Sequence, residues 1–150
     1  MMSGAAPKFE IKNAKGKKIA IISSSWHPEL CQKLIDSAIR ACEEHGATYE
    51  VIYVPGSFEI PFAARKALTK GFNGFAGAVA LGLVLRGQTA HFEYVCEGAT
   101  YGIMKTQLET FKPIGFGILM CDTLEQAHDR AGGKVEDKGY DAAIATLALL

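Results

Sequence analysis

The sequence lacks the features that mark several large classes of protein. Its 150 residues carry 16 Lys and Arg against 16 Asp and Glu, so the basic excess of a generic nucleic-acid or membrane-surface binder is missing. No apolar run is long enough for a transmembrane helix. The first residues, MMSGAAPKFEIKNAKGKK, contain no apolar core of a signal peptide. We therefore expect a cytoplasmic protein with no nucleic-acid or membrane partner.

Metal, redox and nucleotide motifs are also missing. The four cysteines, Cys31, Cys42, Cys96 and Cys121, form no CxxC pair. This spacing favours small buried side chains in a reducing compartment over a zinc or redox site. There is no Walker loop, zinc-binding helix motif or GxSxG elbow.

What is present is an ordinary globular composition, with 49% hydrophobic and 21% charged residues. A chain of this length can bury a core as one domain, so we expect a single domain over residues 1–150. Residues 1–17 precede the first apolar run and are expected to form an extended or flexible N-terminal segment. The polar, glycine-rich stretch at residues 132–140 lies too near the end to separate two domains.

Apolar runs that predict buried strands alternate with segments of helical periodicity. The predicted strands are Lys18–Ser23, Thr48–Val54, Phe75–Leu85 and Ile114–Met120. The first predicted helix begins at Pro28 and is stopped by Gly46, and the second runs from Ile60 to Lys70 and is stopped by Gly71. The third runs from Glu93 to Leu108, and the last from Tyr140 to Leu150. Between them, a helix that ends at about Ala131 begins with a capping box, formed either by Asp122 and Glu125 or by Thr123 and Gln126. This alternation predicts an α/β three-layer sandwich, in which a four-stranded parallel sheet carries helices on both faces in a flavodoxin-like topology.

Polar and aromatic residues follow each predicted strand. They occupy residues 23–27, 55–59, 86–91 and 121–123. In open parallel sheets, ligands bind beyond the carboxyl ends of the strands. We therefore expect these segments to gather at one edge of the sheet and to form the site.

The third of these segments is the most informative. The apolar run up to Leu85 is followed by Arg86-Gly87-Gln88-Thr89 and then by His91. A strand, a polar turn and a helix N-terminus make an anion site, and a histidine there can transfer a proton. This pattern predicts an enzyme acting on an anionic substrate, although His91 can also be an ordinary surface histidine.

Several other residues have two interpretations each. Trp26 either stacks on a flat heterocycle or covers the core. Glu59 either binds a heterocycle or favours the first turn of a helix. Arg86, Arg130 and Lys138 either bind phosphate or pair with carboxylates and solvent. Phe116 belongs to the core unless its strand lies at an interface, and His27, His45 and His128 are interpreted as structural or solvent-facing.

Taken together, four motifs resemble the lumazine synthase family from about Lys17 to the C-terminus. They are VPGSFEIP (54–61), LGLVLRGQTAHFEYV (81–95), GFGILMCDTLEQAHDRAGGK (115–134) and DKG (137–139). The segment SSSWHPELC (23–31) is similar to the tryptophan-bearing members of this family.

The resemblance implies a transferase of riboflavin biosynthesis that needs no metal or organic cofactor. It would condense 5-amino-6-(D-ribitylamino)uracil with 3,4-dihydroxy-2-butanone 4-phosphate to 6,7-dimethyl-8-ribityllumazine, phosphate and water. It also implies a homopentamer with sites between adjacent subunits. Because GGKVEDKG (132–139) has no insertion relative to shell-forming members, we expect pentamers assembled into an icosahedral shell. A non-catalytic flavin or lumazine carrier, a phosphate-binding regulatory domain and a weakly active shell protein are the alternatives.

The resemblance further implies a role for each site residue. His91 would transfer the proton. Trp26 would stack on the pyrimidine, and Leu83, Val84 and Leu85 would line its pocket, with Phe116 supplied by the adjacent subunit. Ser57, Phe58 and Glu59 would surround the ribityl chain. Gln88 and Thr89 would form the phosphate turn, with Arg130 opposite the phosphate and Lys138 on the phosphate side.

Overall fold

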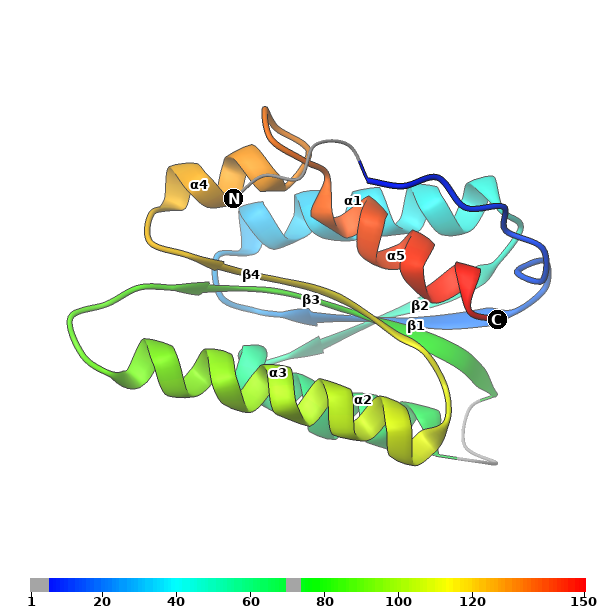
Figure 1. The fold of residues 1–150 in the computed structure, drawn as a ribbon, viewed down its shortest axis with the longest axis horizontal. Helices are drawn as coiled ribbons and strands as arrows, with labels where there is room; N and C mark the ends of the chain where they lie inside the picture. Colours follow the sequence, from blue (N-terminus) through cyan, green and yellow to red (C-terminus); the bar gives the residue numbers. More distant parts are fainter. Residues whose placement is uncertain (1–5, 70–73) are drawn as a thin grey trace.

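In the computed structural model, which describes residues 6–69 and 74–150, four parallel strands lie side by side (Figure 1). The strands are β1 (Lys18–Ser24), β2 (Thr48–Val54), β3 (Phe75–Leu85) and β4 (Ile114–Cys121). Their order in the sheet is β2-β1-β3-β4. The four predicted strands are confirmed, and only β1 and β4 continue one residue further than predicted.

Helices cover both faces of this sheet. They are α1 (Pro28–Glu44), the short 3-10 helix η1 (Ser57–Glu59), α2 (Ile60–Leu68), α3 (His91–Thr110), α4 (Leu124–Arg130) and α5 (Lys138–Ala148). Figure 1 shows α1, α4 and α5 on one face and α2 and α3 on the other, which confirms the predicted three-layer α/β fold. Within the described ranges, none of these helices combines the length and hydropathy needed to cross a membrane.

Side chains of the central strand β1 alternate between two hydrophobic cores. Ile19 and Ile21 belong to the core shared with α1 and α5, whereas Ala20 and Ile22 belong to the core shared with α2 and α3. All four side chains are fully buried. A strand buried on both faces has a continuous apolar sequence, which is why KIAIIS predicted β1 correctly.

The pairing register brings the strand ends to one edge of the sheet. Ser24 at the end of β1 is paired with Val54 at the end of β2. β3 extends further, because its Leu81 pairs with Ser23 and is followed by four more residues of the strand. The end of β3 therefore projects past the end of β1, next to the segments that follow β1 and β2.

Two helices begin earlier than their apolar periodicity predicted. α3 starts at His91 instead of Glu93, and α5 starts at Lys138 instead of Tyr140. At α5 the Asp137 carboxylate accepts a hydrogen bond from the Tyr140 N–H and so caps the helix. Hydrophobic periodicity does not detect a polar first turn, so both predicted starts were wrong.

Three predicted helix ends also need correction. α3 continues two residues past Leu108, until Phe111 adopts a left-handed conformation with φ 54°. α5 ends two residues before Leu150. α2 ends before its predicted limit, Lys70, which lies outside the described residues together with the predicted stop at Gly71.

A capping box begins α4. Thr123 Oγ1 accepts the Gln126 N–H at 3.2 Å, and the Gln126 side chain accepts the Thr123 N–H at 3.3 Å. Of the two predicted boxes, this one is confirmed. The pairing of Asp122 with Glu125 was wrong, because the Asp122 carboxylate binds Arg86 at 2.6 Å instead.

Thr146 joins α5 to two strands and provides a test of the core. Its buried Oγ1 accepts the Gly115 N–H at 2.8 Å and donates to the Ala78 carbonyl at 2.8 Å. Thr146→Val keeps the shape but leaves these groups unpaired, so we expect the free energy of unfolding to fall by about 1–3 kcal/mol in urea titrations. The exposed control Thr48→Val should change it by less than about 0.5 kcal/mol. Equal losses in both variants would contradict this assignment.

Candidate active site

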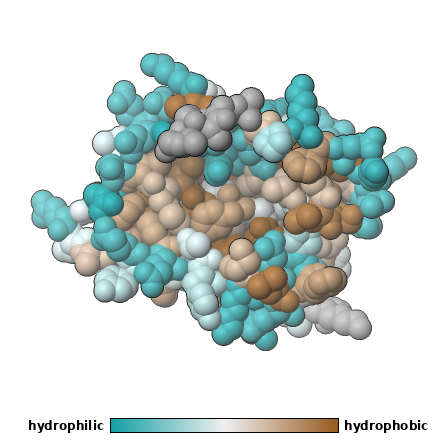
Figure 2. Space-filling model, viewed as in Figure 1, coloured by the Kyte–Doolittle hydropathy of each residue, from teal (hydrophilic) through white to brown (hydrophobic). Residues whose placement is uncertain are grey.

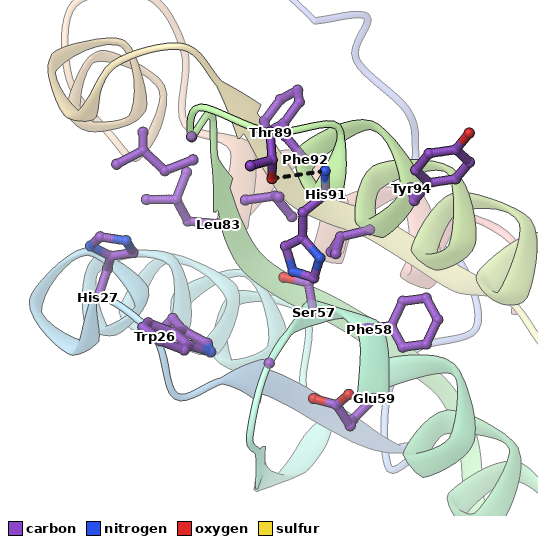
Figure 3. A pocket seen from close by; sticks show the side chains of 15 residues that line it. Trp26, His27, Ser57, Phe58, Glu59, Leu83, Thr89, His91, Phe92 and Tyr94 are labelled. Carbon is purple, nitrogen blue, oxygen red and sulfur yellow. Dashed lines mark hydrogen bonds between the residues drawn. The ribbon is translucent and has the colours of Figure 1, made fainter.

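A cleft of about 620 Å³ opens at the carboxyl ends of β1 and β3. These strands are neighbours, but α1 follows β1 on one face of the sheet and α3 follows β3 on the other (Figure 1). Open parallel sheets bind their ligands at such a point. The cleft is drawn in Figure 3 and is lined by Trp26, His27, Gly56, Ser57, Phe58, Glu59, Leu83, Val84, Leu85, Gly87, Thr89, His91, Phe92, Tyr94 and Val95.

The cleft brings together predicted site residues from three separate stretches of the sequence. These residues are Trp26, Ser57, Phe58, Glu59, Leu83, Val84, Leu85, Thr89 and His91. Gln88 is exposed in the same turn as Thr89 but does not line the cleft. The clustering follows from the parallel order of the strands, which places the segments after β1, β2 and β3 at one edge.

Trp26 and Glu59 form one wall of the cleft, on either side of the Gly56 backbone. A Cβ atom at Gly56 would lie 3.2 Å from Trp26 Cδ1 and 3.2 Å from Glu59 Oε1. The indole is 66% exposed, so one face of it is available to a ligand. A flat ring beside a carboxylate is suited to a planar heterocycle that carries N–H donors.

His27 lies next to Trp26 and also lines the cleft (Figure 3). It is in the left-handed conformation, with φ 52° and ψ 62°, just before α1 begins at Pro28. Non-glycine residues adopt this conformation infrequently, and such strain concentrates at functional sites. His27 thus lies half-buried at the cleft, and its interpretation as a structural or solvent-facing residue stays a prediction.

Ser57 and Phe58 enter the cleft from the short helix η1. Ser57 is 3% exposed, and its Oγ atom has no hydrogen-bond partner among the described residues. The Phe58 ring lies against α3, where a Cβ atom at Gly98 would be only 2.5 Å from Phe58 Cε1. A glycine at this position of α3 thus leaves room for the ring, and Ser57 has an uncommitted hydroxyl beside the cleft.

His91 is the first residue of α3, and the turn before it carries the hydroxyl of Thr89. The His91 N–H donates to Thr89 Oγ1 at 3.3 Å. Other N–H groups in the first turn of a helix have no partner within the helix, so this end of α3 attracts anions. Figure 3 shows the His91 imidazole extending toward Ser57, with Trp26 and His27 across the cleft from it.

Arg86 precedes this turn and binds two carboxylates. Its Nε donates to Asp122 Oδ1 at 2.6 Å, and its Nη1 donates to Glu93 Oε2 at 2.5 Å. The guanidinium also lies 4.3 Å from the centre of the Phe92 ring. The hydrogen bond from Arg86 holds the pKa of Glu93 below its usual value. Of the two interpretations of Arg86, pairing with carboxylates is the one the structure shows.

Three predicted site residues lie away from the cleft of their own chain. Phe116 is half-buried in the edge strand β4. Arg130 ends α4, where its Nη1 donates to the Gln126 carbonyl at 2.9 Å, and Lys138 Nζ is 3.9 Å from Glu136 Oε1. In the described part of the chain, no residue of β4 or of the segments after it lines the cleft.

Three of the four cysteines are buried, as their spacing predicted, whereas Cys96 is not. Cys31, Cys42 and Cys121 are buried, Cys96 is half-buried, and all four are free. Burial raises the pKa of the Cys42 thiol to about 11 and also raises the pKa of Cys31 and Cys121. Over residues 6–69 and 74–150, no three His, Cys, Asp or Glu side chains are grouped so that they can hold a metal ion.

A parallel three-layer fold with a cleft of aromatic, carboxylate and imidazole groups at its switch point is typical of small-molecule enzymes of the α/β class. Comparison with known proteins narrows this class. The family model described as 6,7-dimethyl-8-ribityllumazine synthase matches residues 16–150.

Individual relatives carry the same name. The chain is 45% identical to the 6,7-dimethyl-8-ribityllumazine synthase of Streptomyces coelicolor over 151 residues, which cover 98% of this chain and 92% of the relative. It is 49% identical to the synthase of Arthrobacter sp. (strain FB24) over 134 residues, which cover 87% of this chain and 81% of the relative. It is 45% identical to the synthase of Renibacterium salmoninarum over 156 residues, which cover 97% of this chain and 96% of the relative. The chain therefore belongs to the 6,7-dimethyl-8-ribityllumazine synthase family, as the resemblance predicted, and is a transferase of riboflavin biosynthesis.

Proposed function

We propose that the chain condenses 5-amino-6-(D-ribitylamino)uracil with 3,4-dihydroxy-2-butanone 4-phosphate to form 6,7-dimethyl-8-ribityllumazine, phosphate and water. The observation that carries the proposal is the meeting of Trp26, Glu59 and His91 in one cleft. These groups supply a stacking surface, an acceptor for donors of the pyrimidine substrate, and a base. Their arrangement in a chain of this family supports catalysis over a carrier role.

The pyrimidine substrate occupies the part of the cleft lined by the segments that follow β1 and β2. Its ring stacks on Trp26, and the end of β3, at Leu83–Leu85, forms the apolar lining of its pocket. The ribityl chain lies along Ser57, Phe58 and Glu59. The unpartnered Ser57 hydroxyl and the Glu59 carboxylate are suited to the hydroxyl groups of this chain.

The phosphorylated ketone occupies the other part of the cleft. Its phosphate binds at the turn formed by Gln88 and Thr89, against the N-terminus of α3. His91 follows this turn directly, so the ketone carbonyl is held close to the imidazole. Holding two substrates together in this way supplies a large share of the rate.

Proton transfer is the task of His91. A neutral imidazole accepts the proton from the attacking amine of the pyrimidine as a bond to the ketone carbon forms. Loss of water then gives an imine. Loss of the adjacent C3 proton expels phosphate from C4 and leaves an enol, which tautomerises to a carbonyl at C3. The second nitrogen attacks this carbon, and loss of a second water closes the ring. The same imidazole can then return this proton to the departing oxygen.

A neighbouring copy of the chain completes each cleft in this proposal. Phe116, Arg130 and Lys138 do not line their own cleft, and Phe116 lies on the edge strand β4. The planar guanidinium of Arg130 from the neighbouring copy would bind the phosphate group of the ketone substrate and the free phosphate after it is released. Figure 2 shows apolar side chains across the middle of the face on which β4 is seen in Figure 1. Apolar surface of this kind is typical of contacts between subunits.

Helix α3 carries a second apolar surface that supports assembly. Tyr94, Tyr101 and Leu108 are 69%, 65% and 69% exposed. They are spaced seven residues apart and therefore lie on one side of the helix. We propose that this stripe packs between copies in a homopentamer and that pentamers assemble into a shell. Light scattering that finds only lone pentamers at working concentration would contradict the shell.

The reaction assay separates the enzyme from the carrier. The purified chain, incubated with both substrates, should produce the absorbance of the lumazine and release one phosphate for each lumazine formed. A carrier would bind lumazine or riboflavin without producing either signal. Absence of lumazine and of phosphate, from a protein that binds the pyrimidine, would overturn the proposed function.

Gly56 provides a test of the pyrimidine wall. Its backbone is extended, with φ −150° and ψ 178°, so Gly56→Ala introduces no backbone strain. The added methyl group would press on Trp26 and Glu59. We expect KM for the pyrimidine to rise about 10-fold, with KM for the ketone within about 2-fold of wild type. Because Trp26 is the only tryptophan, its fluorescence reports pyrimidine binding directly, and unchanged affinity would contradict the placement of this wall.

A further inference from the structure

The side chain and backbone of Arg86 tie the turn before His91 to two other segments. The Arg86 N–H donates to the Cys121 carbonyl at the end of β4 at 2.9 Å. Its guanidinium bonds Asp122, which follows β4, and Glu93, in the first turn of α3. A guanidinium presents its donors as a rigid fork, so one side chain can serve both carboxylates.

Two carboxylates therefore stand beside the turn to which we assign the phosphate. Glu93 lies in the first turn of α3, where N–H groups have no partner within the helix. A carboxylate here competes with a bound phosphate for such groups and also repels it. Asp122 adds a second negative charge on the side of β4.

We propose that Arg86 is a positioning residue for the phosphorylated substrate, because it offsets part of the negative charge of Glu93 and Asp122 and thereby keeps the turn at residues 87–90 able to accept an anion. The guanidinium leaves one net negative charge in this cluster, whereas its removal would leave two. The inference rests on the proposed function and adds to it a residue that does not line the cleft.

Arg86→Met removes the charge and keeps a long apolar side chain. We expect KM for the phosphorylated ketone to rise about 10- to 100-fold, and KM for the pyrimidine to stay within about 2-fold of wild type. Binding of inorganic phosphate, measured by isothermal titration calorimetry, should weaken by a similar factor. An equal rise in both KM values, or unchanged phosphate affinity, would overturn the proposal.

Two further variants separate charge from structure. Arg86→Met combined with Glu93→Gln and Asp122→Asn lacks the same hydrogen bonds but carries no uncompensated carboxylate. Its phosphate affinity should return to within about 3-fold of wild type, and Arg86→Lys should stay within about 5-fold. Phosphate binding by the triple variant that is as weak as in Arg86→Met would overturn the charge account.

If Arg86→Met does not fold, the double variant Glu93→Gln with Asp122→Asn provides the measurement, with Arg86 retained. Its unpaired guanidinium should then bind inorganic phosphate more tightly than wild type does, and unchanged or weaker binding would overturn the proposal. Failure of the proposed function has a different signature, because wild-type protein would then make no lumazine from the two substrates. An active wild type whose Arg86→Met variant behaves identically would refute this inference alone.

Discussion

His91→Ala is expected to lower kcat by about 10²- to 10⁴-fold, which is the range for loss of a positioned acid–base group. The imidazole ends in the cleft, whereas the His91 backbone begins α3, so alanine leaves the helix and the polar turn in place. Affinity for the pyrimidine should remain within about 2-fold of wild type, because Trp26 and Glu59 form its wall. Single-turnover kinetics and tryptophan fluorescence measure the two quantities separately.

The matched control is His128→Ala. His128 lies half-buried on α4, with its Nδ1 atom 3.2 Å from Lys33 Nζ, and does not line the cleft. Its replacement should leave kcat within about 2-fold of wild type. A His91→Ala enzyme that keeps more than about a tenth of the wild-type kcat would show that another group moves the proton, and His27 would be the first to test.

Arg130→Ala is expected to lower kcat/KM for the phosphorylated ketone by about 10²- to 10⁴-fold. A guanidinium makes charge-assisted hydrogen bonds with phosphate, each contributing about 1.5–3 kcal/mol. Among the residues that the structure describes, Arg130 Nη1 donates to the Gln126 carbonyl and Arg130 Nε lies 4.0 Å from Glu136 Oε2. Its loss should therefore change the stability of the chain by less than about 1 kcal/mol.

Arg130→Lys is the informative companion to this variant. It keeps the positive charge but loses the planar fork, so we expect activity between that of wild type and Arg130→Ala. Pyrimidine affinity should stay the same in both variants. An Arg130→Ala protein with a wild-type kcat/KM for the ketone would remove Arg130 from the site.

Most of the fold could be predicted from the sequence because the strands are buried on both faces. Continuous apolar runs such as residues 75–85 are assigned as buried strands, and the helices between consecutive strands then predict a parallel sheet. Helix boundaries were less predictable, because polar caps such as Asp137 and the left-handed Phe111 set them. Hydrophobic periodicity contains no information about these groups.

The candidate site was predictable where its residues follow strands directly, as Trp26 and His91 do. The lining of the cleft by His27 was not predicted, because its left-handed backbone leaves no mark in composition or periodicity. The partners of Arg86 were also unpredictable, since Asp122 is 36 residues away and is brought close only by the pairing of β3 with β4. Phe116 and Arg130 do not line the cleft of their own chain, and in the proposed assembly their positions depend on a neighbouring copy.

The central claim is that His91 of one copy and Arg130 of the next act at the same cleft. Co-expression of His91→Ala and Arg130→Ala chains tests it directly, because each variant alone is expected to be nearly inactive. In a mixed ring, about a quarter of the contacts between neighbours would join an intact His91 to an intact Arg130, so about a quarter of wild-type activity should return. Mixed assemblies that are no more active than the separate variants would contradict the claim.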